Sequence, residues 1–176
     1  MYHFADSDPG RPMKSFVPGP ERQRDFRDAL GRFATGVTVV TTDTPEGPVG
    51  ITANSFSSVS LDPPIVLWSI GRHSRRFPAF AQCRDFAVHV LGADQLELSR
   101  RFARAGEAFA GLDHDRSEAG VPLLKGCLSR FECARLATHD GGDHAIVVAR
   151  VVAASFAEGE PLLFAGGGYG RFDRFA

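Results

Sequence analysis

Short polar side chains are concentrated between Gly50 and Pro64, directly after a strand-like segment at 49–53. They are one carboxamide and four hydroxyls: Asn54, Ser55, Ser57, Ser58 and Ser60. Hydroxyls and backbone N–H groups at a strand end can bind a ligand that carries a phosphate and the polar edge of a heteroaromatic ring. The alternative is a serine-rich loop at the surface, whose hydroxyls bond only to neighbouring backbone.

A second polar group follows the next apolar run. Residues 65–70, IVLWSI, form a nearly continuous apolar segment, which predicts a strand buried on both faces. The turn after it, GRHSRR at 71–76, places three arginines around Ser74: Arg72, Arg75 and Arg76. Guanidinium groups beside a hydroxyl can bind a phosphate, and the alternative is a solvated basic turn.

The third candidate is His144, in the sequence HDGGDH at 139–144. Asp-Gly and Gly-Gly between β-rich runs at 128–138 and 145–156 predict a hairpin. His144 beside Asp143 could serve the site, cap the turn or form a surface ion pair. His139 and His144 have no third metal ligand at a usable spacing, so no metal site is expected. The sequence also shows no evident nucleophile–histidine–acid trio.

The remaining pattern predicts the elements that position these residues. Apolar residues at helical spacing predict a helix at 23–34 that ends near Gly36. A β-branched run predicts a strand at 37–42, joined by a turn at 43–48 to the strand at 49–53. Further expected elements are a short helix at 77–81, a strand at 85–91, a helix from Asp94 to about 102, a long loop at 104–122 and a short strand at 161–164. Strands and helices do not alternate, which favours a mainly antiparallel β-barrel with peripheral helices.

Overall composition sets limits on function. The chain has 176 residues with a net charge of −1, which gives no electrostatic footprint for nucleic acid or an anionic membrane. Three cysteines without CxxC spacing favour neither a disulfide scaffold nor a zinc site. Residues 1–20 are polar, with no signal-peptide core, and predict a flexible arm before a single domain at 21–176. We therefore expect a cytoplasmic protein without a membrane span.

Several blocks resemble the flavin reductase-like domain family, the small NAD(P)H:flavin oxidoreductases that serve two-component monooxygenases. The first are FRDALGRFATGVTVVTT at 26–42 and GPVGITANSFSSVSLDPPIVLWSI at 47–70. The blocks FAVHVL at 86–91, GDHAIVVARV at 142–151 and PLLF with GGGYGRF near the end follow in the same order. The resemblance covers about 26–172 and leaves out only the N-terminal arm.

The resemblance implies a split β-barrel of antiparallel Greek-key type that dimerises and binds FMN or FAD. It implies that Thr52, Ala53, Asn54 and Ser55 run along the flavin ring, with Ser57 and Ser58 near the ribityl phosphate. The segment from Ser69 to Arg76 resembles a second phosphate-side contact. The family often has Lys or Ser-x-Thr there, so it stays open whether Ser74, Arg75 or Arg76 binds the phosphate.

Two more residues take roles from the resemblance. His144 matches a histidine beside the flavin and nicotinamide site, and Tyr169 lies in a segment that approaches the same cleft. The implied activity is NADH- or NADPH-dependent reduction of flavin, and the reduced flavin is delivered to a separate oxygenase component. Alternatives are a split-barrel flavoprotein with permanently bound FMN that reduces a corrinoid or metal complex, and a non-catalytic flavin-binding protein.

Overall fold

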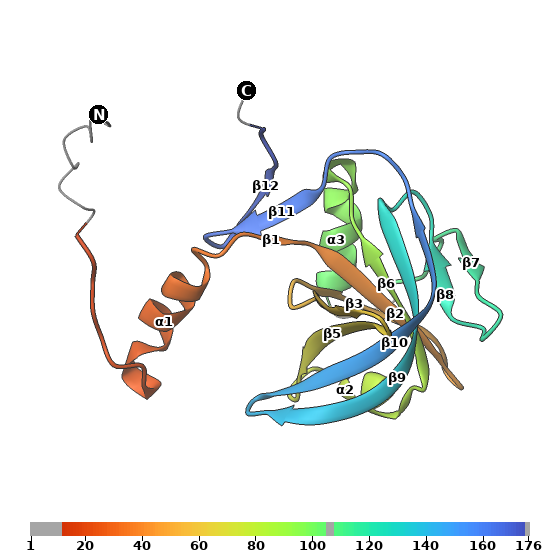
Figure 1. Ribbon diagram of the computed structural model, residues 1–176, viewed down its shortest axis with the longest axis horizontal. Coiled ribbons are helices and arrows are strands. Elements are labelled where there is room, and N and C mark those ends of the chain that lie inside the picture. Colours follow the sequence, from red (N-terminus) through yellow and green to blue (C-terminus); the bar gives the residue numbers. More distant parts are fainter. Residues whose placement is uncertain (1–11, 105–107, 175–176) are drawn as a thin grey trace.

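The computed structural model describes residues 12–104 and 108–174 and consists mainly of β-strands with a few short helices (Figure 1). The helical elements are η1 (Pro20–Arg22), α1 (Gln23–Leu30), α2 (Phe77–Gln82), η2 (Ala93–Gln95) and α3 (Leu96–Ala103). The strands are β1 (Thr35–Gly36), β2 (Thr38–Thr44), β3 (Gly47–Ala53), β4 (Ser57–Leu61), β5 (Pro64–Gly71), β6 (Asp85–Val90), β7 (His114–Arg116), β8 (Pro122–Leu124), β9 (Ser129–Gly141), β10 (His144–Phe156), β11 (Leu162–Ala165) and β12 (Gly168–Arg171).

Seven strands form the central sheet, in the order β3-β2-β6-β9-β10-β5-β4. Every pairing in it is antiparallel, as the sequence predicted. Strands β3 and β4 are the two edges of this order, so hydrogen bonding between strands does not close the sheet into a ring. The fold class, mainly β with few helices, is therefore confirmed at this level.

The expected hairpin at 139–144 is the tip of the long β9–β10 ribbon (Figure 1). Its register shifts twice, between Val148 and Ala149 and between Val151 and Ala153. The shifts leave Leu136 and Val152 outside the paired register, and both are exposed, by 51% and 64%. Such irregularities increase strand twist and redirect side chains, so they turn two apolar residues outward.

The main core lies against one face of β5. Val66, Trp68 and Ile70 are buried, whereas the residues between them are only half-buried. The prediction of a strand buried on both faces was therefore wrong, because β5 has the period-two burial of an antiparallel sheet with one covered face. Trp68 contacts Phe80 of α2 and Phe86 of β6, which fixes the helix that follows the arginine-rich turn.

Three other sequence predictions are corrected. The first helix ends at Leu30, since Gly31 is its C-cap and Thr35–Gly36 is a strand. The serine-rich segment is not a loop throughout, because 57–61 forms β4 against β5. Asp94 does not cap the next helix; it lies inside η2, whose N-cap is Gly92.

The predicted loop at 104–122 contains ordered structure in its described part. Strand β7 pairs with β8, which begins at Pro122, so the end of this segment is a small hairpin. Other elements match their predictions closely, including the β2–β3 hairpin, α2 and β6.

The C-terminal strands form a separate three-stranded sheet, β1-β11-β12. Gly166 and Gly167 connect β11 to β12 with φ of 56° and 81°, a conformation that glycine adopts without strain. The Gly166 N–H also donates to Gly31 O at 2.7 Å, which ties this turn to the end of α1.

Helix α1 stands apart from the central sheet and buries none of its residues (Figure 1). Phe26 and Leu30 are exposed by 43% and 59%. Among the described residues, no helix has the length and apolar character needed to cross a membrane.

Candidate functional site

The predicted ligand strand, β3, lies under helix α3, and two of its residues fit the helix closely. Gly50 leaves room for the Phe102 ring, with which a Cβ at this position would collide. Thr52 Oγ1 donates a hydrogen bond to Ser99 O over 2.6 Å. Because these residues are two apart on a strand, they face the same side, toward α3.

A small cleft of about 160 Å³ opens at the end of β3. Its lining residues come from the end of β3 and the residue after it, from the C-terminal sheet and from the link between β1 and β2: Thr52, Ala53, Asn54, Phe164, Tyr169 and Val37. The structure thus brings together four of the predicted cofactor residues. Asn54 is exposed, and its carboxamide has no hydrogen-bond partner in the described part of the chain, so it can bind a ligand. The Thr52 hydroxyl is occupied by Ser99.

Tyr169 forms the wall of this cleft opposite β3. Its ring packs edge-on against Phe164, with 5.2 Å between centroids. Its hydroxyl accepts a hydrogen bond from Ser99 Oγ at 3.0 Å. Ser99 itself is fully buried in α3, so one helix residue contacts both walls of the cleft.

A larger cleft of about 950 Å³ lies along the start of β3 and contains the basic turn. Pro48, Val49 and Gly50 line one side, and Ser74, Arg75 and Arg76 line another. Arg75 is exposed, with no side-chain partner among the described residues, so its guanidinium is available to an anion.

Arg76 is less available than its neighbour. Its guanidinium donates to Arg104 O, just after α3, and its backbone N–H donates to Ser74 Oγ at 3.2 Å. Burial lowers the pKa of the Arg76 guanidinium from its usual value, since a charge is less well solvated there. Arg76 therefore supports the wall of the cleft, with its guanidinium engaged by the chain just after α3.

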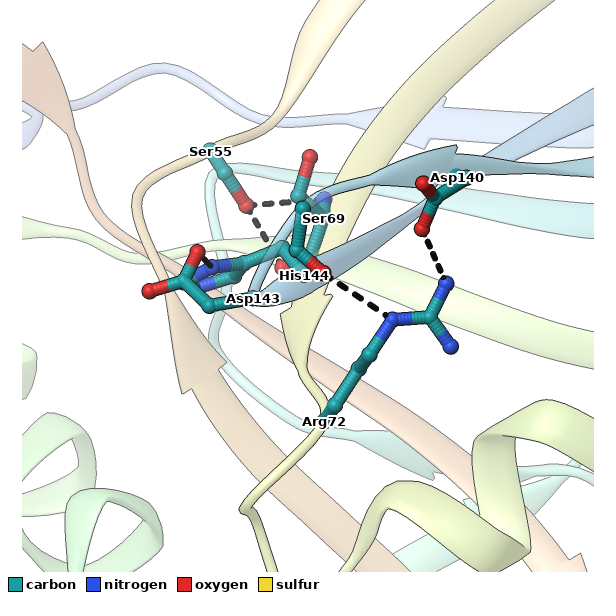
Figure 2. Close-up of polar contacts among 7 residues, drawn as sticks. Ser55, Ser69, Arg72, Asp140, Asp143 and His144 are labelled. Carbon is teal, nitrogen blue, oxygen red and sulfur yellow. Dashed lines mark hydrogen bonds and ion pairs between the residues drawn. The ribbon is translucent and has the colours of Figure 1, made fainter.

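Ser55 and Ser69 are joined directly (Figure 2). The Ser55 hydroxyl donates to Ser69 O and accepts from Ser69 N–H, both at 2.9 Å. Ser55 therefore provides a hydrogen-bond partner for both the N–H and the C=O of Ser69. Ser69 lies on β5 outside the stretch that pairs with β4, which ends at Leu67. The contact links the chain after β3 to β5, and it occupies the Ser55 hydroxyl.

Arg72 holds the tip of the β9–β10 hairpin rather than an open anion site (Figure 2). Its Nη2 contacts Asp140 Oδ1 at 2.6 Å, and its Nε donates to Gly142 O at 3.1 Å. Its backbone N–H donates to Asp143 O at 2.8 Å. Arg72 is therefore already engaged by the hairpin, whereas Arg75 of the same turn has no side-chain partner among the described residues.

His144 is the first residue of β10 and lies opposite Gly71 at the end of β5. Its Nδ1 is 2.7 Å from Asp143 Oδ1, and because an ionised carboxylate only accepts, this nitrogen carries the proton. The bond from His144 lowers the pKa of the Asp143 carboxyl below its ordinary value. Nε2 remains beside Gly71, where the absence of a side chain leaves space.

Ser57 and Ser58 lie on β4 and are exposed, outside the linings of both clefts. The Ser57 hydroxyl donates only to Ser58 O, at 3.2 Å. The predicted residues thus fall into separate groups, at the end of β3, at the basic turn and at the hairpin tip. No set of three or more His, Cys, Asp and Glu residues in a metal-holding arrangement occurs within 12–104 and 108–174.

Sequence reasoning missed Ser99 and Phe109. Ser99 lies on the buried side of α3, and a single serine in a helix does not by itself indicate a functional role. Its role is visible only from its hydrogen bond to Tyr169, which is distant in sequence. Phe109 lines the large cleft and packs edge-on against Phe102, with 5.1 Å between centroids. The surplus of phenylalanine was the available signal, but core filling explained it equally well.

Comparison with known proteins identifies the family. The family model described as "Flavin reductase like domain" matches residues 30–173. The chain belongs to this family. The sequence resemblance is therefore confirmed, and the family match covers β3, the basic turn, the hairpin tip and Tyr169.

Similar proteins have names that describe flavin reductases or reductase subunits. The chain is 58% identical over 159 residues to the FMN reductase (NADH) SmoA of Agrobacterium fabrum, covering 90% of this chain and 91% of that protein. It is 41% identical to the reductase subunit HsaB of a flavin-dependent monooxygenase from Rhodococcus jostii, covering 83% and 76%. The structure of an NADH:FAD oxidoreductase from Streptomyces globisporus C-1027, in complex with NAD and FAD fragments, superposes with a TM-score of 0.84 at 38% identity, covering 90% and 98%.

Proposed function

We propose that this chain is an NADH-dependent flavin reductase that supplies reduced flavin to a separate monooxygenase. The observation that carries the proposal is the 58% identity, over 90% of the chain, to a protein named FMN reductase (NADH). The relationship to a monooxygenase reductase subunit supports the second half. FMN is the expected first flavin, with FAD as the alternative because a structural relative is an NADH:FAD oxidoreductase.

The chemistry of the clefts fits a flavin nucleotide. The small cleft, about 160 Å³, is below the usual range for a whole ligand and suits one edge of a ring system. Asn54 offers both a donor and an acceptor there, as a pyrimidine-like edge requires. The backbone of Thr52 and Ala53 continues the same lining, so the hydroxyl of Thr52 is not needed for binding.

The large cleft, about 950 Å³, has room for the nucleotide parts. Arg75 is the proposed phosphate ligand, with Ser74 and Arg76 as supporting donors, because the Arg75 guanidinium is exposed and has no side-chain partner in the part of the chain that the structure describes. Ser57 and Ser58 remain proposed contacts to the ribityl phosphate, and their exposure leaves them accessible. A basic turn that binds the flavin phosphate is compatible with NADH, whereas one that binds a 2′-phosphate would favour NADPH.

In hydride transfer between nicotinamide and flavin, the two cofactors supply the reactive atoms. The chain's task is to align two rings, and correct alignment is worth several kcal/mol of the barrier (~7 kcal/mol or more in well-oriented model reactions). The structural contact between Ser55 and Ser69 fixes the strand end beside the hairpin tip. His144 is proposed to face the nicotinamide side through Nε2, while Asp143 holds its ring orientation.

The proposal includes a split β-barrel and a homodimer. The Ser55–Ser69 contact supports barrel closure, since it joins the chain leaving edge strand β3 to β5 near the other edge. Outward-facing apolar residues support a second copy as the partner. They lie on the sheet, at Leu136, Val152 and Phe156, and on α1, at Phe26 and Leu30.

Light scattering coupled to size exclusion tests the dimer. Val152→Asp and Phe156→Asp should shift the mass toward one chain, because a charge at a buried interface is costly. Phe172→Asp, in an exposed residue after β12, is the matched control. A wild-type mass of one chain would remove the homodimer.

Nicotinamide oxidation by the purified chain tests the activity. NADH and NADPH are each supplied with FMN, FAD, riboflavin or no flavin, aerobically and anaerobically. Rapid oxidation that saturates with added flavin supports the reductase, and the better pair gives its preferred substrates. A protein that stays yellow with stoichiometric FMN after dialysis points instead to a flavoprotein that reduces another acceptor. Flavin binding without oxidation under any condition points to a binding or storage protein.

A further inference from the structure

Ser99 is a fully buried polar residue at the centre of α3, and it is hydrogen-bonded to two other elements. Serine in a helix commonly bonds the carbonyl one turn earlier, which consumes its hydroxyl locally. Ser99 Oγ instead donates to the Tyr169 hydroxyl, 70 residues away in sequence, at 3.0 Å. Its carbonyl accepts the bond from Thr52 Oγ1.

Strand β12, which carries Tyr169, makes few other contacts with the rest of the described structure. All four of its residues are exposed, and it pairs with β11 on one side only. Among residues 12–104 and 108–174, the bond to Ser99 is the one side-chain hydrogen bond that joins β12 to another element. The position of the Tyr169 ring therefore depends on this bond and on its contact with Phe164.

The two bonds of Ser99 reach opposite walls of the small cleft. Thr52 belongs to the β3 wall, and Tyr169 forms the facing wall. Because Ser99 sits in a packed helix that also contacts Gly50 through Phe102, it is a fixed reference point for both. Because Thr52 bonds the Ser99 backbone carbonyl, a side-chain change at Ser99 releases only Tyr169 and removes no group that lines the cleft.

We propose that Ser99 is a positioning residue that sets the width of the cleft and thereby the rate at which flavin leaves. The inference rests on the proposed function, in which a flavin ring edge occupies this cleft. When the Ser99–Tyr169 hydrogen bond is intact, the Tyr169 side chain is already ordered before the flavin ring binds. Little conformational entropy is therefore lost on binding. Without this bond, the Tyr169 side chain keeps its contact with Phe164 but has no hydrogen bond among the described residues, and flavin dissociates faster. For an enzyme that delivers reduced flavin, this bond sets the balance between retention and release.

Four variants test the proposal: Ser99→Ala, Tyr169→Phe, the double variant and Ser99→Thr. FMN binding is followed by the change in flavin fluorescence, which gives both Kd and the dissociation rate constant. Each of the first two should raise the dissociation rate about three- to tenfold, the effect of one hydrogen bond. The double variant should be no worse than either single one, and Ser99→Thr, which keeps the hydroxyl, should retain most of the wild-type rate.

Ser117→Ala is the matched control, since its hydroxyl accepts a bond from Val121 N–H at 3.0 Å in the β7–β8 hairpin, away from the cleft. It should leave FMN dissociation unchanged. Tyr169→Phe keeps the ring and alters a partly exposed residue, so it remains informative if Ser99→Ala folds poorly.

Unchanged FMN dissociation in Tyr169→Phe, or additive effects in the double variant, would overturn the proposal. A lowered Tm with unchanged dissociation would mean that the bond serves the fold alone. A wild-type chain that binds FMN but does not oxidise NADH would remove the reductase while the dissociation rates still decide the role of Ser99. A chain that binds no flavin would overturn both.

Discussion

Arg72, in the turn after β5, forms an ion pair with Asp140 on the facing hairpin, with 2.6 Å between Nη2 and Oδ1. Both groups are partly exposed, so the pair alone contributes little to stability. Its importance is geometric, because Arg72 also donates to Gly142 O and, through its backbone, to Asp143 O. These contacts attach the hairpin tip that carries His144 to the end of β5.

We expect Arg72→Ala to slow NADH oxidation about threefold to tenfold at saturating flavin, the loss of one or two hydrogen bonds at the site. Its FMN Kd should stay near the wild-type value, because Arg72 lines neither cleft. Steady-state turnover and fluorescence titration measure the two effects separately. Arg135→Ala is the control for losing an arginine that bonds backbone, because its guanidinium donates to Ala81 O of α2 and it lines neither cleft. A parallel loss of FMN binding in Arg72→Ala would contradict a hairpin role.

Asn54→Ala should weaken FMN binding about tenfold, since the side chain offers a donor and an acceptor that have no other partner among the described residues. Ser117→Ala is the comparison, because its hydroxyl accepts a hydrogen bond from Val121 N–H in the β7–β8 hairpin and lines neither cleft. Fluorescence titration of FMN measures both. Equal affinities in wild type and Asn54→Ala would remove this residue from the ring edge.

Arg75→Ala should distinguish flavins by their phosphate. FMN and FAD carry phosphate and riboflavin does not, so the variant should bind FMN about tenfold more weakly and riboflavin equally well. The FMN affinity of the wild type should also fall with rising salt more steeply than that of the variant. If the FMN-to-riboflavin preference survives the substitution, the phosphate lies elsewhere, and Ser57 and Ser58 become the stronger candidates.

His144→Ala should lower turnover more than it weakens FMN binding. The histidine is placed by Asp143 at the hairpin tip, outside both cleft linings, so flavin can bind without it. A loss of about tenfold in kcat is expected for a residue that aligns rather than reacts. Asp143→Asn tests the orientation separately, because it keeps a hydrogen-bond acceptor but loses the charge. An unchanged kcat in His144→Ala would show that His144 serves only the structure of the hairpin turn.

Much of the fold follows from periodicity and turn chemistry. The β2–β3 hairpin, β6 and the β9–β10 hairpin each occur where apolar alternation and glycine predicted them. Strand β4 was missed because serine has weak strand propensity. Its strand conformation comes from pairing with β5, which local sequence does not encode.

Contacts between residues distant in sequence also determine which side chains of the site have free polar groups. Asn54 and Arg75 could be selected from sequence because their side chains are polar and lie beside strand ends. Thr52, Ser55 and Arg72 were also plausible ligands, but the structure occupies their polar groups with Ser99, Ser69 and the hairpin tip. Partners distant in sequence decide which donors already have a hydrogen bond within the protein, and residue type alone does not show this.

His89 is a buried histidine whose two hydrogen-bond partners are distant in sequence. It is fully buried on β6, where Nδ1 donates to Val39 O and Nε2 accepts from Leu124 N–H, both at 3.1 Å. Burial, with a smaller contribution from the Arg130 charge, lowers the pKa of His89 from 6.5 to about 4. The neutral ring thus joins β2, β6 and β8 through both nitrogens.

Because the folded pKa is depressed, the unfolded chain binds this proton more readily, and stability falls as the pH decreases. The contribution of His89 is fully present above pH 6.5 and is lost between 6.5 and about 4. A shift of this size corresponds to about 3 kcal/mol of unfolding free energy. Urea unfolding across this range should show a steeper loss in wild type than in His89→Gln, which offers a donor and an acceptor but does not titrate. Parallel pH profiles for the two proteins would show that His89 is not the acid-sensitive group, since the carboxylates are common to both.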